Sequence, residues 1–302
     1  MSDNFEMVID RGRLRRKVTF WRVIAVVLAI LVLLTMISPA GPVPTPYVAR
    51  ITISGIIMEN TARDENIRSL AKDDRAKALI VHINSPGGGS TASEQLYHAI
   101  RKVAEEKPVV ITMGSLAASG GYITALAGDH IVARETTITG SIGVIMQYSH
   151  FGELMDKIGI GSEQVKSGKL KGDPDGLHPM GEEARAVFQS MIDDSFDWFT
   201  GLVADRRQID LEKVKKLSDG RVYTGRQALS NGLIDSLGGQ EEAMGWLVVE
   251  KGISDDLPVI DVDKSRKELL MEEFFNSIMG KMPFNEVLSL DGLISVWQPD
   301  NY

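Results

Sequence analysis

The sequence contains no cysteine and only five histidines in its 302 residues. The missing thiols exclude a cysteine nucleophile, disulfide bonds and thiolate metal sites. The histidines lack HExxH or a comparable ligand spacing, and the glycine run 87–89 lacks the Gly-Lys-Ser/Thr of a nucleotide loop. We therefore expect no metal and no cofactor. With 33 basic and 41 acidic residues, nothing indicates nucleic acid as a partner.

Long apolar runs are also rare, and the clearest one lies near the N-terminus. A basic stretch ends at Lys17, and residues 18–38 are then almost wholly apolar and about as long as a bilayer is thick. The positive charge before the run predicts a cytoplasmic tail at 1–17, a transmembrane anchor at 18–38 and an outside location for the rest. A cleaved signal peptide is the competing interpretation, although 38–40 would be a poor cleavage site.

Strand-like and helix-like segments alternate in the first half of the chain after a Pro-rich linker at 39–46. The pattern predicts α/β layers with functional residues at the carboxyl ends of the strands. Residues past 150 are expected to be mainly helical. The predicted strands are 47–57, 77–84, 109–113, 129–133 and 141–146. The predicted helices are 64–72, 91–105, 122–127, 151–158, 182–208, 211–217, 225–230, 240–250 and 265–278.

Two of these predicted helices carry apolar residues at helical spacing, which indicates one buried face on each. On the first helix that face comprises Ala92, Leu96, Ala99, Ile100 and Val103. On the second it comprises Ala186, Phe188, Met191, Ile192, Phe196, Phe199 and Val203.

The sequence centres on Ser119, which lies between a predicted strand and a predicted helix and is followed by two glycines. A serine on such a turn is exposed, and the next amide, that of Gly120, can donate to an oxyanion formed by its attack. A serine that merely caps a helix start is equally compatible with these residues.

A nucleophilic serine needs a base, and the residues alone leave its identity open. His130 follows an aspartate at a strand start, and His178 lies in a Gly/Pro/Asp-rich loop, so either could complete a triad. A lysine is the other option, but it acts as a base only when neutral. That state requires burial or a nearby cation to bring a lysine pKa down from ~10.4.

Five segments of the sequence resemble motifs of the signal peptide peptidase A family of S49 serine proteases, both in their order and in their spacing. The resemblance covers roughly residues 48–250, and it implies the ClpP/crotonase fold with repeated ββα units and a helical C-terminal part. It also implies a catalytic Ser/Lys dyad and a protease domain at 47–262, with a C-terminal extension at 263–302. The segments are Asn84-Ser85-Pro86-Gly87-Gly88, Ala117-Ala118-Ser119-Gly120-Gly121-Tyr122, Thr139-Gly140-Ser141-Ile142-Gly143, Lys166-Ser167-Gly168-Lys169-Leu170-Lys171 and the run 219–228.

The resemblance assigns a role to each matching residue. Ser119 would be the nucleophile, Lys171 the general base and Ser141 the residue that orients the lysine amine. The amides of Gly88 and Gly120 would form the oxyanion hole. Only the family pattern selects Lys171 over Lys166 and Lys169. Asp173 and Asp175 would oppose its neutral state if they lay close to it.

The same resemblance implies a membrane-anchored endopeptidase, held by residues 18–38 at the outer face of a bacterial cytoplasmic membrane. Its expected substrates are remnant signal peptides and other apolar peptides. It implies a ring-like homo-oligomer, with an octamer as the expected size, in which serine and lysine meet at a subunit junction.

Three alternatives remain open at the level of the sequence. A crotonase-like acyl-CoA enzyme would also use glycine amides, but it needs no serine at position 119 and no anchor. A non-catalytic ring-forming scaffold would not need Ser119, Ser141 and Lys171 intact. A protease that removes damaged membrane proteins would differ in substrate alone. The segment 263–302 either packs on its own domain or serves as an assembly arm.

Overall fold

The structure is a computed structural model that describes residues 17–28 and residues 46–262, which belong to separate units of the chain. Residues 17–28 are helical. Within the described ranges, none of the helices is both long enough and apolar enough to cross a bilayer. The remainder of the predicted anchor, most of the linker and the C-terminal extension lie outside the described residues.

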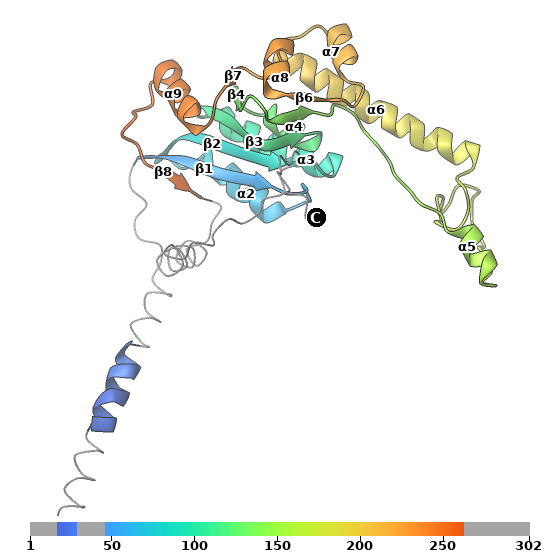
Figure 1. The fold of residues 1–302 in the computed structure, drawn as a ribbon, viewed down its shortest axis with the longest axis horizontal. Helices are drawn as coiled ribbons and strands as arrows, with labels where there is room; N and C mark the ends of the chain where they lie inside the picture. Colours follow the sequence, from blue (N-terminus) through green and yellow to red (C-terminus); the bar gives the residue numbers. More distant parts are fainter. Residues whose placement is uncertain (1–16, 29–45, 263–302) are drawn as a thin grey trace, which may run out of the picture. The chain divides into compact units, whose positions relative to one another are not determined.

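Residues 46–262 form alternating strands and helices, as the sequence predicts (Figure 1). The strands are β1 (Tyr47–Ser54), β2 (Ala76–Ser85), β3 (Val109–Ala118), β4 (His130–Ala133), β5 (Ile138–Gly140), β6 (Val222–Thr224), β7 (Ser236–Leu237) and β8 (Val259–Asp261). The helices are α2 (Thr61–Leu70), α3 (Ser90–Ala104), α4 (Gly120–Ala125), α5 (Gly152–Lys157), α6 (Glu182–Arg207), α7 (Leu211–Leu217), α8 (Gly225–Asn231) and α9 (Gln240–Lys251).

The strands join in one sheet with the order β6-β5-β3-β2-β1-β8, and β4 lies beside β3 with β7 at its outer side. The pairs are parallel except that of β5 with β6. The first half of β3 pairs with β4 and its second half with β5, so β3 extends past its first neighbour. The carboxyl end of β3 is therefore where a site is expected.

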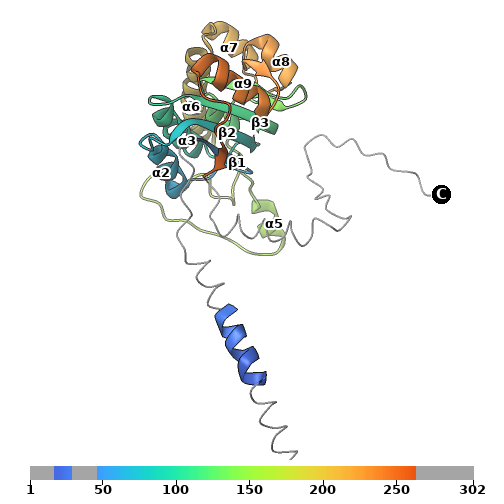
Figure 2. The same cartoon turned by 90° about the vertical axis from the view of Figure 1, so that its left-hand side faces the viewer.

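Helices cover both faces of this sheet (Figures 1 and 2). On one face α9 places Ala243 and Leu247 against Val48, Ile80 and Val110, all fully buried. On the other face lie α2, α3 and α4, and the predicted apolar face of α3 is buried throughout. This prediction from helical spacing is confirmed.

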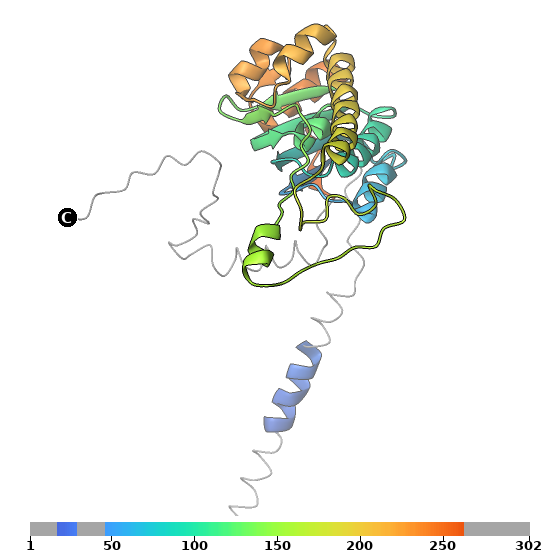
Figure 3. The same cartoon turned by 90° about the vertical axis from the view of Figure 1, so that its right-hand side faces the viewer.

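The second predicted helical face is only partly correct. Phe199 and Val203 in the C-terminal half of α6 are fully buried, whereas Met191 is 59% exposed. Arg206 donates to two carbonyls of the α4 end, and Arg207 forms an ion pair with Asp235 at 2.7 Å. One half of α6 is thus fixed to the core. The segment between β5 and α6, which includes α5, leaves the sheet and returns at the N-terminal end of α6 (Figure 3).

The predicted strand at 141–146 is wrong. Strand β5 ends at Gly140, and residues 141–150 have no regular structure. Gly140 and Ser141 both have positive φ, at 81° and 49°, and such a backbone turns the chain out of an extended strand.

Candidate active site

Ser119 occupies the turn between β3 and α4 at the carboxyl end of the sheet. Its backbone angles are φ 53° and ψ −119°, a conformation that L-residues rarely adopt. Its amide donates to the carbonyl of Gly140 at 2.8 Å, which ties the turn to β5. Its side chain makes no capping hydrogen bond, although it stands at the N-cap of α4. The strained backbone thus presents a hydroxyl that the helix does not use.

The loop after β2 lies directly against this turn. The amide of Ile57 donates to Gly87 at 2.9 Å, and Gly89 donates to Ile57 at 3.1 Å. In such a parallel bridge the amide of the intervening residue, Gly88, points away from Ile57. The Gly88 nitrogen lies 3.1 Å from the point where a Cβ of Gly120 would stand. The loop therefore brings the two predicted oxyanion amides beside Ser119.

A small pocket of about 20 Å³ opens beside Ser119. Its lining includes Gly88, Ser119 and Gly120. The remaining lining residues are Ser90, Ile123, Gly143, Val144, Ser195, Trp198 and Phe199.

Ser141 lies next to the same turn, directly after the carbonyl of Gly140 that holds the Ser119 amide. It is partly buried, and its own amide donates to Arg221 at 2.9 Å. Its neighbour Gly143 contributes to the pocket. The structure thus brings four predicted site residues, Gly88, Ser119, Gly120 and Ser141, to one end of the sheet.

Lys171 is not among the residues that line the Ser119 pocket. It is exposed on the segment between β5 and α6. Its rivals are engaged elsewhere, because Lys166 pairs with Asp173 at 2.6 Å and Lys169 pairs with Glu183. This ion pair offsets the negative charge of Asp173, which is one of the two carboxylates that would disfavour a neutral Lys171 if they lay close to it.

The second nearby carboxylate, Asp175, is also engaged. It accepts from His178 Nδ1 at 2.8 Å and from the amides of Leu177 and His178 at 2.9 Å. His178 is exposed on the same segment as Lys171, and it is absent from the lining of the Ser119 pocket.

The other histidine considered as a base, His130, lies at the wrong end of the sheet. It is opposite Val110 at the start of β3, whereas Ser119 follows the last residue of that strand. Nine residue steps along the strand separate the two positions, which corresponds to roughly 30 Å. His130 stacks on Trp246 and hydrogen-bonds Ser236 at 2.9 Å. It is a structural residue in this chain.

His82 and His130 predict how stability depends on pH. Burial lowers the pKa of both imidazoles below the ordinary 6.5. The unfolded chain therefore takes up protons near pH 6.5 while the folded chain stays neutral, and the free energy of unfolding falls as the pH drops below about 6.5. Each histidine contributes up to about 1.4 kcal/mol per unit by which its pKa is lowered.

Thermal unfolding measured between pH 5 and 8 checks this dependence. A variant with His82→Gln and His130→Gln is expected to lose part of the slope in the acid range. An unchanged slope in this variant would assign the acid sensitivity to the carboxylates instead.

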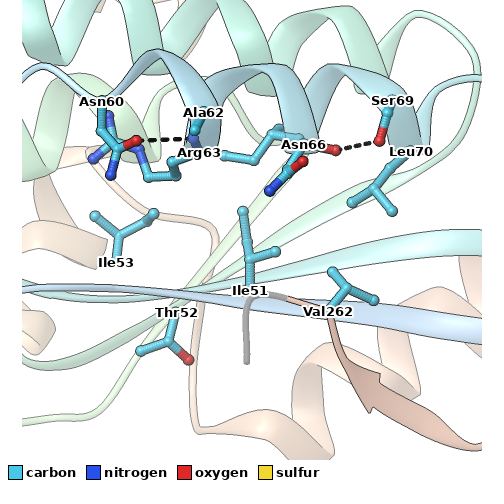
Figure 4. A pocket seen from close by; sticks show the side chains of 11 residues that line it. Ile51, Thr52, Ile53, Asn60, Ala62, Arg63, Asn66, Ser69, Leu70 and Val262 are labelled. Carbon is cyan, nitrogen blue, oxygen red and sulfur yellow. Dashed lines mark hydrogen bonds between the residues drawn. The ribbon is translucent and has the colours of Figure 1, made fainter. Parts of the chain in front are cut away.

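A larger hollow in the described part of the chain shares no residue with the Ser119 pocket. A cavity of about 560 Å³ lies between α2 and β1, where Arg63, Asn66 and Leu70 stand above Ile51 and Val262 (Figure 4). Within the described residues no group of three or more His, Asp or Glu side chains is placed to hold a metal ion.

Comparison with protein families decides the assignment of this chain. The model of peptidase family S49 matches residues 101–254, and that of Clp protease matches residues 48–150. A curated protein of Synechocystis, "Putative protease slr0021", is 36% identical over 237 residues, which cover 78% of this chain and 85% of that protein. The chain belongs to peptidase family S49.

Further relatives give this S49 peptidase its type. The "Putative signal peptide peptidase SppA" of Enterococcus faecium is 36% identical over 63% of this chain and 55% of that protein. The "Protease 4" of Haemophilus influenzae is 33% identical over 65% of this chain and 34% of that protein. The chain thus spans about half or less of these two proteins. Together with the S49 match they identify a serine protease of the SppA type.

A solved structure of a mutant of the "1510-N membrane-bound stomatin-specific protease" matches with a TM-score of 0.50. It is 17% identical and covers 74% of this chain and 100% of that one. This likeness bears on the fold alone, and it agrees with the ClpP-like α/β architecture that the sequence predicts.

Sequence reasoning missed the contribution of α6 to the site. It assigned Phe199 to a buried helix face and attached no role to Ser195 or Trp198. Their spacing at i, i+3 and i+4 places all three on one side of the helix, but periodicity alone does not separate a core face from a pocket wall.

Proposed function

We propose that this S49 peptidase is a membrane-anchored endopeptidase in which Ser119 is the nucleophile and Lys171 the general base. Ser141 orients the lysine amine, and the amides of Gly88 and Gly120 bind the oxyanion. The observation that carries the proposal is the strained Ser119 turn, with a hydroxyl not used in capping and the Gly88 loop packed against it.

The chemistry follows from these positions. The neutral Lys171 amine takes the proton of the Ser119 hydroxyl as its oxygen attacks the peptide carbonyl. The carbonyl oxygen becomes negative and is stabilised by the two glycine amides. The protonated lysine gives its proton to the leaving amine as the C–N bond breaks. A water molecule then hydrolyses the ester on Ser119, with the lysine again accepting a proton.

An exposed Lys171 does not by itself meet the requirement that the base be neutral and close to Ser119. We therefore propose that a neighbouring copy of the chain supplies Lys171 in a ring-like homo-oligomer, with an octamer as the expected size. Burial at the subunit junction would favour the neutral amine.

The surface of the segment between β5 and α6 supports this assembly. Its apolar side chains are exposed to a degree that monomeric proteins rarely maintain, which marks an interaction surface. These side chains are Ile145, Phe151, Leu154, Ile158, Ile160 and Val165, each 48% exposed or more.

The anchor and the substrates complete the proposal. Residues 18–38 would anchor the chain in the bacterial cytoplasmic membrane, with residues 1–17 in the cytoplasm and the protease domain, 47–262, outside. The helix at 17–28 lies partly in this stretch, and Phe20 and Trp21 are more than 60% exposed on it. Remnant signal peptides and other apolar peptides would reach a site held at this surface.

Labelling of the serine tests the nucleophile. Full-length protein in detergent should react with a fluorophosphonate and hydrolyse an apolar, signal-sequence-like peptide, and Ser119→Ala should lose both properties by at least about 10³-fold. Ser230→Ala is the matched control, because that hydroxyl donates to the Arg226 carbonyl within α8. Hydrolysis at the wild-type rate by Ser119→Ala would overturn the proposal.

A further inference from the structure

One buried hydroxyl beside the Gly88 loop makes contacts that the proposed mechanism does not use. Ser85 is the last residue of β2 and is fully buried. Its Oγ donates to the carbonyl of Gly55 at 2.6 Å and accepts from the amide of Gly87 at 3.0 Å. A hydroxyl carries a single proton, so the Gly87 carbonyl, 3.4 Å from Oγ, takes its hydrogen bond from another donor. The side chain thus joins the loop after β1 to the loop after β2.

These contacts restrain a residue that has little restraint of its own. Gly87 has a φ of 104°, a value that suits glycine, and it lacks a Cβ that would confine its backbone. The peptide group after it is held by the Ile57 amide, which donates to the Gly87 carbonyl at 2.9 Å. The peptide group before it is held by Ser85 through the Gly87 amide. The two bonds together fix the direction of the Gly88 amide, because the amide and the carbonyl of one peptide group point opposite ways.

Gly87 also lies directly against the turn that carries the nucleophile. A Cβ on Gly87 would stand 2.7 Å from the nitrogen of Gly120 and 3.0 Å from the Cβ of Ser119. Ser85 itself pairs with Ala117 of β3, two residues before Ser119. A rotation of the backbone at Gly87 therefore moves one oxyanion amide relative to the other, and a misplacement of about 1 Å can cost about 10²-fold in rate.

We propose that Ser85 is a positioning residue that holds the Gly88 amide in the direction needed to bind the oxyanion. The proposal rests on the proposed roles of Ser119 and Gly88, and Ser85 acts through the loop rather than on the substrate. Ser85→Ala leaves the Gly87 amide and the Gly55 carbonyl buried without this partner, which is costly. The loop shifts to pair them elsewhere, and the Gly88 amide turns away from the oxyanion. Substrate binding changes little, so the loss falls on kcat.

Steady-state hydrolysis of an apolar, signal-sequence-like peptide by full-length Ser85→Ala in detergent tests the proposal. We expect kcat to fall at least about tenfold, with KM changed less than about threefold. The inhibition constant of a peptide aldehyde should rise in parallel with the fall in kcat, because its adduct with Ser119 places an oxyanion at the same amides. Binding of the uncut peptide should be equal in Ser119→Ala with and without Ser85→Ala.

Thr137→Val is the matched control. Thr137 is 1% exposed, and its hydroxyl makes the same two kinds of bond. It donates to the carbonyl of Gly114 at 2.7 Å and accepts from the amide of Arg134 at 3.1 Å. Thr137 is not among the described residues that line the Ser119 pocket. Both variants should lower the melting temperature, but Thr137→Val should keep kcat within about twofold of the wild-type value.

Ser85→Cys covers the case in which Ser85→Ala does not fold. A thiol has nearly the shape of the hydroxyl but is a weak donor and a weak acceptor. We expect kcat to fall at least about threefold in this variant, again with KM little changed. A folded Ser85→Cys enzyme with the wild-type kcat and the wild-type inhibition constant for the aldehyde would contradict the proposal.

Two further results would overturn the positioning role while leaving the protease intact. One is a folded Ser85→Ala enzyme with the wild-type kcat and a lowered melting temperature, which would make Ser85 a structural residue. The other is a loss of kcat that is equal in Ser85→Ala and Thr137→Val. A wild type that cleaves no peptide and whose Ser119 does not react with a fluorophosphonate overturns the proposed function, and the role of Ser85 with it.

Discussion

A mixture of Ser119→Ala and Lys171→Ala subunits is expected to regain about one quarter of the wild-type peptidase activity, although each variant alone is inactive. Each junction in the proposed ring combines Ser119 of one subunit with Lys171 of the next. In a random one-to-one mixture, half of the subunits carry an intact serine, and half of their neighbours carry an intact lysine. The product of these fractions gives the expected recovery.

The measurement is peptide hydrolysis by co-expressed, copurified oligomers, with the mixing verified by mass. Lys169→Ala is the matched control, because this lysine pairs with Glu183 and should be dispensable for catalysis. A mixed oligomer without recovered activity would place the dyad within one chain. A Lys171→Ala enzyme that is active alone would transfer the role of base, with His178 as the next candidate.

Substitution by alanine is expected to lower the peptidase activity strongly at Gly88 and very little at the neighbouring Gly89. In Gly88→Ala the new Cβ would stand 2.0 Å from the carbonyl oxygen of Ile57 and 2.6 Å from its nitrogen. Backbone atoms cannot move aside as a flexible side chain can, so the loop must shift and carry the Gly88 amide away from Ser119. Loss of one oxyanion donor alone costs about 10²–10³ in kcat.

Gly89→Ala is the matched control for this prediction. Its Cβ would meet only Ala92 at 3.6 Å, an ordinary contact, and its φ of −60° suits alanine. We expect activity close to that of the wild type, measured as kcat/KM alongside fluorophosphonate labelling and the melting temperature. Equal losses in the two variants would show that the loop, rather than the position of the Gly88 amide, controls the rate.

The long central elements were readable from the sequence because their patterns are local. β-branched runs predict β1 to β3, and the spacing of Leu96, Ile100 and Val103 predicts the buried face of α3. The short strands β6, β7 and β8 were missed. Two or three residues carry no usable alternation, and such strands exist only because a longer partner offers unpaired backbone groups.

The candidate site likewise has one part that the sequence predicts and another that it does not. The turn at Ser119 follows from small residues and glycines that are adjacent in sequence, so its strained geometry could be anticipated. The pocket wall at Trp198 could not, since it depends on where α6 meets the end of α4, a contact that joins Arg206 to Leu126 across 80 residues of sequence. The predicted face of α6 was wrong in its N-terminal half, where side chains such as Met191 remain exposed.

By itself the sequence determined the order of strands and helices, the absence of thiol chemistry and the glycine turns at the strand ends, since these depend on neighbouring residues. Only the tertiary structure decided which strand ends lie side by side. Parallel pairing placed Gly88 beside Ser119 and put His130 at the opposite end of β3. Distances between residues far apart in the chain depend on strand register and helix packing, which the sum of many weak contacts sets and no single motif records.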